Sequence, residues 1–239
     1  MGILIAAAVI PALILLVRVY RLDRLEREPA GLLLSLVLLG VLSTALASFA
    51  EQVGDFVLAF FLPEQSLLDQ VLLYFGVVAF SEEGFKYLLL RTRTWRSPQF
   101  NCQFDGVVYA VFVSLGFALW ENIGYVLAYG FSAALARAVT AIPGHACFGV
   151  FMGVWYGAAK RQEMAGEISR SRRSRRMAVC IPALLHGLYD YLATQEYEET
   201  ALIFLVFVAV LFFVSWRLIR ANAKRDRYIV PPRPPYGPR

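Results

Sequence analysis

Seven long apolar runs dominate this 239-residue chain and constrain its fold more than any other feature. Hydrophobic residues make up 59% of the sequence, far more than one soluble core of this length can bury. A helix needs about 20 residues to cross the hydrocarbon core of a bilayer. The runs are long enough, or nearly so, and lie at about residues 3–19, 31–50, 67–90, 104–128, 132–159, 177–194 and 200–219. The sequence therefore predicts an all-α, polytopic bundle of about seven transmembrane helices.

Positive charge alternates between successive connections, and this alternation predicts an orientation. Lys and Arg follow the first, third, fifth and seventh runs, whereas the connections at 51–66, 129–131 and 195–199 contain neither. Cytoplasmic loops of membrane proteins are enriched in these residues. We therefore expect the N-terminus outside and the C-terminus in the cytoplasm. The same clustering accounts for the net charge of +5 without a nucleic-acid partner.

Two segments do not fit a pattern of crossing helices. Residues 52–62 carry an apolar stretch that is too short to cross, so we expect an interfacial or re-entrant piece on the outer side. Residues 231–239 are rich in proline, which favours polyproline II or disorder. We therefore divide the chain into one integral membrane domain at residues 1–225 and a Pro-rich, disordered cytoplasmic tail at residues 226–239.

Three charged residues interrupt the third apolar run, where Glu82 and Glu83 are followed by Lys86. Helical spacing puts Lys86 within reach of either carboxylate. An ion pair near the end of the helix, with the lysine reaching toward the interface, explains one acid. It does not explain two consecutive acids, which point about 100 degrees apart on a helix. We expect one acid to pair with Lys86 and the other to face a site.

The fourth run carries Glu121 and Asn122 toward its outer half. Small residues precede Asn122 at intervals of four, namely Gly106, Ala110, Ser114 and Ala118. Such a stripe permits the close approach of another helix, so Asn122 should face the bundle with Glu121 at the edge of that face. A structural hydrogen bond near the outer interface is the alternative role for Glu121.

Both histidines of the chain lie inside apolar runs. His145 continues a stripe of glycines spaced by four residues, so it should point into the protein. His186 and Asp190 are also four residues apart, and Asp190 can either orient the ring of His186 or join it as a second ligand. A lone buried histidine is more often a structural donor, but the presence of two favours a shared site.

Burying these groups requires compensation, because each charged side chain costs about 2.5 to 3.5 kcal/mol at a helix centre on insertion scales. The four membrane carboxylates and the lysine leave a formal excess of three negative charges when both histidines are neutral. Protonated carboxylates or a bound cation would offset this excess. Two histidines with acidic oxygens suit Zn²⁺, although the chain has no His-Glu-x-x-His motif. The ligands expected for such a metal are His145, His186, Glu121 and Asp190.

In this order along four successive helices, these residues resemble the PrsW family of bacterial membrane proteases, within the superfamily of CAAX-type intramembrane proteases. The resemblance covers about residues 20–195 and begins with the juxtamembrane stretch at 23–29. Its motifs are Glu82-Glu83-x-x-Lys86, Phe117-x-x-x-Glu121-Asn122, the isolated His145, and His186-x-x-x-Asp190. The wider superfamily pattern has His in place of Glu121 and Asn in place of Asp190, and these departures fit the PrsW branch.

The resemblance implies an intramembrane endopeptidase of the bacterial cytoplasmic membrane, with a catalytic core formed by the third to sixth helices. Glu82 or Glu83 would act as general base toward a water held by His145, with or without a metal. His186, oriented by Asp190, would stabilise the oxyanion or ligate the metal. Supporting roles would fall to Lys86, Glu121, Asn122 and Asp190. The expected partners are the lipid bilayer and a membrane-anchored protein substrate of the anti-sigma-factor kind.

Two other functions are compatible with the residues alone. In a proton- or ion-coupled transporter, buried acids and histidines form a relay, and the protein shows flux without peptide cleavage. In a haem protein, His145 and His186 would ligate the iron, which would be visible in an absorption spectrum. The residues by themselves support an enzyme and a transporter about equally, and the resemblance favours the protease.

Overall fold

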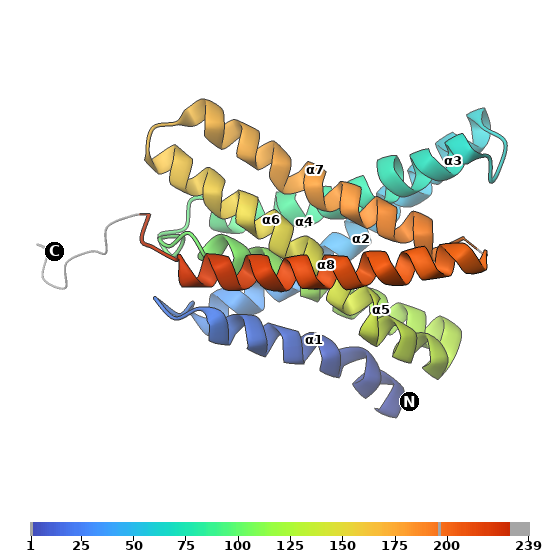
Figure 1. Ribbon diagram of the computed structural model, residues 1–239, viewed down its shortest axis with the longest axis horizontal. Helices are drawn as coiled ribbons and strands as arrows, with labels where there is room; N and C mark the ends of the chain where they lie inside the picture. Colours follow the sequence, from blue (N-terminus) through green and yellow to red (C-terminus); the bar gives the residue numbers. More distant parts are fainter. Residues whose placement is uncertain (1, 196, 230–239) are drawn as a thin grey trace, which may run out of the picture.

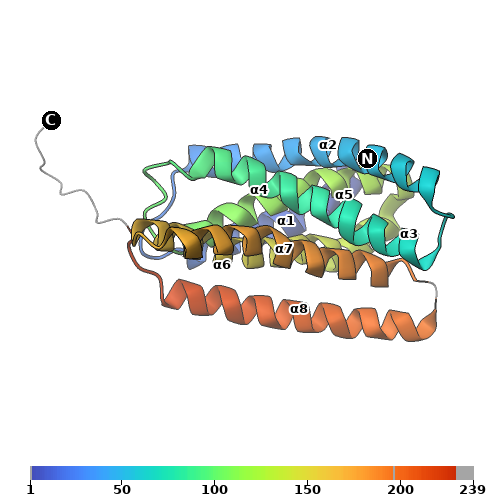
Figure 2. The same cartoon turned by 90° about the horizontal axis from the view of Figure 1, so that it is seen from above.

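The computed structural model describes residues 2–195 and 197–229, and this part of the chain is helical, with no β-strand (Figure 1). The α-helices are α1 (Gly2–Leu22), α2 (Ala30–Phe61), α3 (Leu67–Val71), α4 (Phe80–Thr94), α5 (Asp105–Val139), α6 (Ala141–Met164), α7 (Ile168–Ala193) and α8 (Glu198–Lys224). A π-helical stretch, η1 (Leu72–Ala79), joins α3 to α4, so residues 67–94 form one continuous helical run. The helices lie lengthwise in one bundle (Figure 2). The predicted all-α class is confirmed.

Within the described residues, four helical segments are long and apolar enough to cross a bilayer. They are Ala30–Phe61, Asp105–Ser132, Leu135–Met164 and Glu198–Lys224. The helices that carry the acidic pair and the second histidine are more polar. Helix α4 contains Glu82, Glu83, a lysine and two arginines within 15 residues, and α7 begins with a run of arginines. The chain therefore has the helices of an integral membrane protein, and α4 and α7 are among its more highly charged helices.

Helix α2 is longer than its apolar run, and it corrects one prediction. The segment at 52–62 is not a separate interfacial or re-entrant piece, because α2 continues through it to Phe61. No proline occurs within these 32 residues, and Pro63 comes only after the helix has ended. At 1.5 Å per residue, α2 is about 48 Å long, which exceeds the hydrocarbon core of about 30 Å. Helix α2 is therefore longer than an upright crossing of the hydrocarbon core requires.

Two breaks divide the chain between the fourth and fifth apolar runs. Gly130 has a φ of 81°, a conformation that glycine adopts without steric cost, and it interrupts the helical geometry of α5. Thr140, with φ −117° and ψ −67°, separates α5 from α6. The predicted run at 132–159 therefore consists of a short helical segment followed by α6. The short segment carries Arg137, whose position matters for the site.

The close contact between α5 and α6 depends on the predicted glycine stripe. A Cβ atom at Gly149 would lie 2.9 Å from the Cβ of Ser114, and one at Gly153 would overlap the Cα of Val107. Every residue of α5 from 105 to 118 is buried, so this helix is the centre of the bundle. The stripe holds α6 against α5 and places His145, one turn before Gly149, beside the second half of α5.

Helices α1 and α8 lie at the outside of the bundle. Helix α1 packs against α5 and α6, whereas α8 packs against α6 and α7 and runs along one side (Figure 2). After α8 the chain returns to the loop before α5. The backbone N–H of Ile229 donates to the carbonyl of Asn101 at 2.7 Å, and that of Phe104 donates to Asp226 Oδ1 at 2.8 Å. The rest of the predicted tail, residues 230–239, lies outside the described residues.

Candidate active site

A buried cluster of charged side chains centres on Lys86 of α4. Its Nζ lies 2.8 Å from Glu83 Oε1 and 3.1 Å from Glu82 Oε2. It also lies 3.2 Å from Nδ1 of His145 on α6, and 3.8 Å from the ring centroid of Phe117 on α5. The lysine side chain is fully buried. Lys86 therefore pairs with both acids, where the sequence led us to expect a pair with only one.

The π-helical stretch η1 ends directly before the turn that carries the acidic pair. Its i→i+5 hydrogen bonds make a wider turn than an α-helix, and such stretches occur frequently at functional sites. Gly187 of α7 packs against η1, because an added Cβ would lie 2.7 Å from Cδ1 of Phe75. This close approach of α7 brings His186, the residue before Gly187, beside Glu82 and Glu83.

His145 joins α6 to both α4 and α5. Its Nδ1 faces the ammonium of Lys86, and its Nε2 lies 2.8 Å from Oε2 of Glu121. An ammonium group only donates hydrogen bonds, so Nδ1 must be the acceptor and Nε2–H the donor to Glu121. These two contacts fix the tautomer and the orientation of a neutral imidazole ring.

Glu121 is held in turn by Arg137, which comes from the short segment between the two chain breaks. The guanidinium Nη2 lies 3.0 Å from Glu121 Oε1, and Nε donates to Asn122 Oδ1 at 3.2 Å. Arg137 thus bridges Asn122, which the sequence placed on the bundle face, and Glu121, which it placed at the edge of that face. The result is a connected chain of contacts from Arg137 through Glu121 to His145.

His186 on α7 lies between two carboxylates. Its Nδ1 is 3.1 Å from Glu83 Oε1 and 3.8 Å from Glu82 Oε2, and its Nε2 is 3.4 Å from Asp190 Oδ2. The ring of Phe148 stacks on the imidazole, with centroids 4.6 Å apart and an interplanar angle of 21°. The aromatic ring and the carboxylates therefore hold His186 in one orientation, and Asp190 lies in the orienting position, one of the two roles that its spacing allowed.

A cavity of about 650 Å³ opens onto this cluster. Glu82 and both histidines line it, whereas Glu83 and Lys86 lie behind them. Hydroxyl and aromatic side chains from α2, η1 and α8 complete the walls, among them Thr44, Ser48, Tyr74 and Phe204. Glu121 and Asp190 also line the cavity. All eight predicted site residues thus belong to one connected group of side chains, and their catalytic roles stay predictions.

The donor atoms that lie closest together differ from the predicted metal-ligand set. Glu82, Glu83, His145 and His186 each offer one ligand atom, and these four atoms lie within 4.8 Å of one another. Glu121 and Asp190 instead contact Nε2 of the two rings, on the side away from the acidic pair. That position suits carboxylates that orient metal-binding histidines. Two imidazoles and two carboxylates fit a divalent metal such as zinc.

Two charged residues of the site were missed by sequence reasoning. Arg137 lies within a run that we took as apolar, and Glu51 of α2 lies in a segment that we took as an outer connection. Glu51 lines the cavity, and its Oε1 is buried without a hydrogen-bond partner. A charged residue within a long helical run indicates a functional site, and this feature could have identified both residues from the sequence. Their charges cancel, so the formal excess of three negative charges remains.

Comparisons with known proteins identify a family and several relatives of this chain. A family described as PrsW family intramembrane metalloprotease matches residues 28–216. Protease PrsW of Geobacillus kaustophilus is 32% identical over 230 residues, which cover 96% of each chain. Protease PrsW of Halalkalibacterium halodurans is 30% identical over 224 residues, which cover 94% of this chain and 99% of the relative. The protein of the same name from Bacillus subtilis is 30% identical over 191 residues, or 80% of this chain and 83% of the relative. No solved structure matches this chain.

Proposed function

The chain belongs to the PrsW family of intramembrane metalloproteases, and from this membership we propose that it cleaves a membrane-anchored protein with Glu82 as the general base. The family identifies it as a peptidase of the membrane. The substrate, the base and the metal are parts of the proposal. The observation that carries the choice of Glu82 is its place on the cavity wall beside both histidines.

The two consecutive acids occupy different environments, and this difference separates their proposed roles. Glu82 lines the cavity, where a water molecule and a substrate have access to it. Glu83 is fully buried, and its Oε1 already contacts both Lys86 and His186. A general base must reach the proton that it abstracts. Glu82 meets this requirement, while Glu83 is suited to hold the lysine and the second histidine in place.

The proposed reaction is hydrolysis of a peptide bond in the cavity. Glu82 takes a proton from water as the water oxygen attacks the carbonyl carbon, and the carbonyl electron pair moves onto its oxygen. Nε2–H of His186, on the side of the ring that faces Asp190 and the cavity, donates a hydrogen bond to this oxyanion. Glu82 then returns the proton to the amide nitrogen as the C–N bond breaks. The products are a carboxylic acid and an amine, and Glu82 is again ionised.

The family is described as metalloproteases, and we propose zinc as the metal. Glu83, His145 and His186 would hold it, because they belong to the four donors that lie within 4.8 Å of one another, and Glu82, the fourth, is left free to act as the base. When bound, such a metal supplies Lewis-acid polarisation of the water or the carbonyl. Its charge would offset two of the three excess negative charges. The protein supplies the orientation of both rings, through Glu121 and Asp190.

The cavity lies toward the end of the bundle that is poor in Lys and Arg. Its walls include Ala193 and Thr194, at the end of α7 opposite to the arginine run of that helix. With the orientation expected from the basic connections, this end faces outward. We therefore propose that the enzyme cleaves its substrate in the outer half of the membrane. A single-pass protein of the anti-sigma-factor kind is the substrate class that the family resemblance suggests.

The test compares Glu82→Gln with Glu83→Gln in purified protein, against tagged single-pass membrane proteins from the same organism. Removal of a general base should lower the cleavage rate by about 100- to 10,000-fold, so Glu82→Gln should be nearly inactive. Glu83→Gln should retain more activity than Glu82→Gln. It should melt at a lower temperature than Glu82→Gln, because Lys86 and His186 are held less firmly. Glu198→Gln, an exposed acid at the start of α8, is the matched control and should cleave like the wild type.

Two results would contradict this assignment. If Glu82→Gln cleaved normally while Glu83→Gln stayed folded and inactive, Glu83 would be the base. If the wild type cleaved none of the single-pass proteins, the substrate class would be wrong. Metal analysis of the purified protein tests the cofactor separately, since His145→Ala should carry less zinc than Glu198→Gln whether or not either is active.

A further inference from the structure

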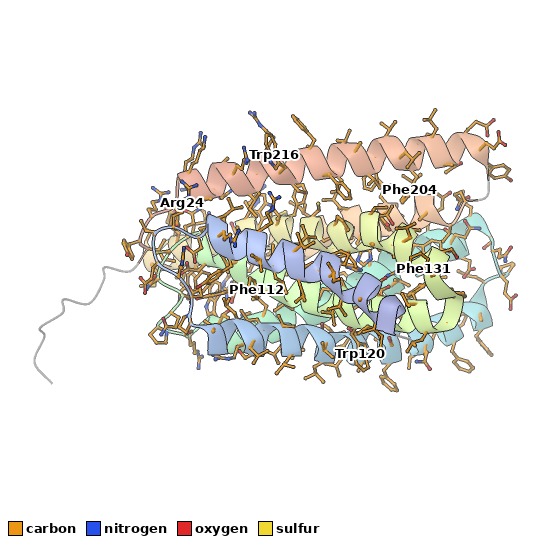
Figure 3. All side chains as sticks on the ribbon, turned by 90° about the horizontal axis from the view of Figure 1, so that it is seen from below. Arg24, Phe112, Trp120, Phe131, Phe204 and Trp216 are labelled. Carbon is orange, nitrogen blue, oxygen red and sulfur yellow. The ribbon has the colours of Figure 1, made fainter. Side chains whose placement is uncertain are left out.

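An apolar groove of about 610 Å³ runs between α1 and α8 on the outside of the bundle (Figure 3). Ile14 and Leu15 line it from α1, and Phe212 and Trp216 line it from α8. Its floor is α6, where Ala146 and neighbouring residues are accessible from the groove. The groove is separate from the cavity at the active site, and the catalytic proposal does not use it.

Basic side chains gather at one end of this groove. Arg18 and Arg21 of α1, Arg24 just after α1, and Arg220 of α8 line it there. A second cavity, of about 480 Å³, is lined by Leu22, Arg24, Arg220, Ala223 and Lys224. Because three residues, Leu22, Arg24 and Arg220, line both cavities, the two are adjoining compartments of one site. Figure 3 shows Arg24 at the end of the bundle where α1 and α8 both finish.

The second cavity, which we call the basic compartment, has no acidic ion-pair partner for Arg24, Arg220 or Lys224 within the part of the chain that the structure describes. In the described residues, the basic groups that form ion pairs are Lys86, Arg137, Arg170 and the two histidines. Arg24, Arg220 and Lys224 form none with any described residue. Arg220 instead lies 4.5 Å over the ring of Trp216. Guanidinium groups suit phosphate oxygens in particular, because their planar forks donate two parallel hydrogen bonds. The compartment is therefore complementary to an anionic group that carries phosphate.

The length of the groove limits what can fill it. Ile14 and Leu22 are eight residues apart on α1, which corresponds to about 12 Å along the helix axis, and Arg24 follows just beyond the end of the helix. This is about half of the 30 Å hydrocarbon core, or one leaflet. A transmembrane helix of a substrate or of a second copy would need a groove along the whole core. An acyl chain that descends from a headgroup occupies one leaflet only.

We propose that this groove binds an anionic phospholipid from the leaflet on the basic side of the protein. The phosphate contacts Arg24, Arg220 and Lys224, and the acyl chains lie between α1 and α8 on the floor provided by α6. Basic pockets between transmembrane helices bind lipid headgroups in this manner. The bound lipid joins two peripheral helices to α6, whose opposite face carries His145.

The test is native mass spectrometry of the purified full-length protein with dioleoyl phosphatidylglycerol, dioleoyl phosphatidylcholine or inorganic phosphate as probes. We expect phosphatidylglycerol to bind at least tenfold more tightly than phosphatidylcholine, and phosphate alone to show no retained adduct. The double variant Arg24→Gln/Arg220→Gln should weaken phosphatidylglycerol binding at least tenfold. The matched control, Arg96→Gln/Arg173→Gln, removes the same charge from exposed positions that line neither compartment and should bind like the wild type.

A second variant tests the apolar half of the site. Ile14 is 54% exposed, so Ile14→Trp fills the groove without crowding the core, and it should weaken phosphatidylglycerol binding while every arginine remains. Equal binding of the two lipids, or equal losses in the two double variants, would overturn the proposal in favour of diffuse surface charge. Retention of phosphate without lipid would show an anion site instead. A dimer that dissociates in Ile14→Trp would identify a second copy as the occupant.

Discussion

Lys86 and His145 meet through a 3.2 Å contact between Nζ and Nδ1. Because the ammonium only donates, this contact keeps the proton of the neutral ring on Nε2, where it is donated to Glu121. The same Nζ also contacts both acids of α4. One ammonium group therefore lies against three of the four side chains whose ligand atoms are close enough to bind a metal ion. Lysine and metal must compete for these donors.

This competition predicts that Lys86→Met binds zinc more tightly than the wild type. The methionine keeps an unbranched apolar stem but removes a positive charge and three hydrogen bonds to the donors. We expect the Kd for zinc to fall at least tenfold, measured by competition with a chromophoric chelator. Lys160→Met is the matched control, since Lys160 is also buried but donates to the carbonyl of Trp95. Weaker zinc binding in Lys86→Met would mean that the lysine positions the acids for the metal.

Arg137 should act on the histidine through Glu121. Arg137→Gln keeps a polar side chain but removes the ion pair at 3.0 Å, so Glu121 is less firmly held against His145. Loss of such an orienting partner typically costs 10- to 100-fold in activity, and we expect a reduction of this size in kcat. Because both residues act through one ring, Arg137→Gln/Glu121→Gln should cost about as much as the larger single change.

A structural role alone would give a different pattern for Arg137. If the ion pair only stabilised the fold, the two single variants would melt at lower temperature with an unchanged kcat at low temperature. Arg170→Gln is the matched control, because Arg170 forms an exposed pair with Glu167 at 3.2 Å. Exposed pairs contribute little, so this variant should match the wild type in both measurements.

The sequence predicted the parts of the site that depend on spacing along one helix. Glu83 and Lys86 are three residues apart, and His186 and Asp190 are four apart, so their contacts follow from helical geometry. The contact between His145 and Glu121 depends instead on the relative depth of α5 and α6, which the breaks at Gly130 and Thr140 determine. Arg137 could not be assigned to the site without the short segment between those breaks.

The fold was predictable at the level of helix number but less so in helix length. The lengths of the apolar stretches predicted seven helical runs, and each is present. Polar residues such as Gln52 and Asp55 suggested an end to the second run, yet the helix continues because no proline stops it before Pro63. The π-helical stretch η1 has no pattern that distinguishes it from an α-helix, since its residues are apolar throughout.

The contact between α5 and α6 predicts a large effect of a single methyl group. Gly153→Ala would place a Cβ against the Cα of Val107 and the carbonyl of Gly106, so the two backbones must separate. Overpacking of this kind costs about 1 to 3 kcal/mol, and we expect a clear fall in the melting temperature in detergent. Gly124→Ala is the control, because its Cβ would meet nothing within 4 Å. A stable Gly153→Ala would contradict the close helix contact.

The loop between α1 and α2 predicts a dependence of stability on pH. Glu28 is 5% exposed, and burial raises its pKa from 4.5 to about 7, with the nearby carboxylates of Asp23 and Glu26 adding to the effect. Burial likewise raises the pKa of Asp23 from 3.8 to about 6. At a pH between the unfolded and the folded pKa of each carboxyl group, the folded state binds more protons than the unfolded state. The free energy of unfolding should therefore fall as the pH rises from about 4.5 to about 7.

Glu28→Gln tests this expectation, because the amide keeps the shape of the side chain and cannot ionise. The variant should be more stable than the wild type at pH 8, by on the order of 1 to 3 kcal/mol, and the two should converge near pH 4.5. Thermal unfolding in detergent across this range measures the difference. Glu64→Gln, at an exposed position beyond α2, should follow the wild-type curve. If Glu28→Gln were less stable than the wild type at pH 8, the ionised carboxylate would have to be stabilised by a partner, such as a bound cation, that offsets its burial.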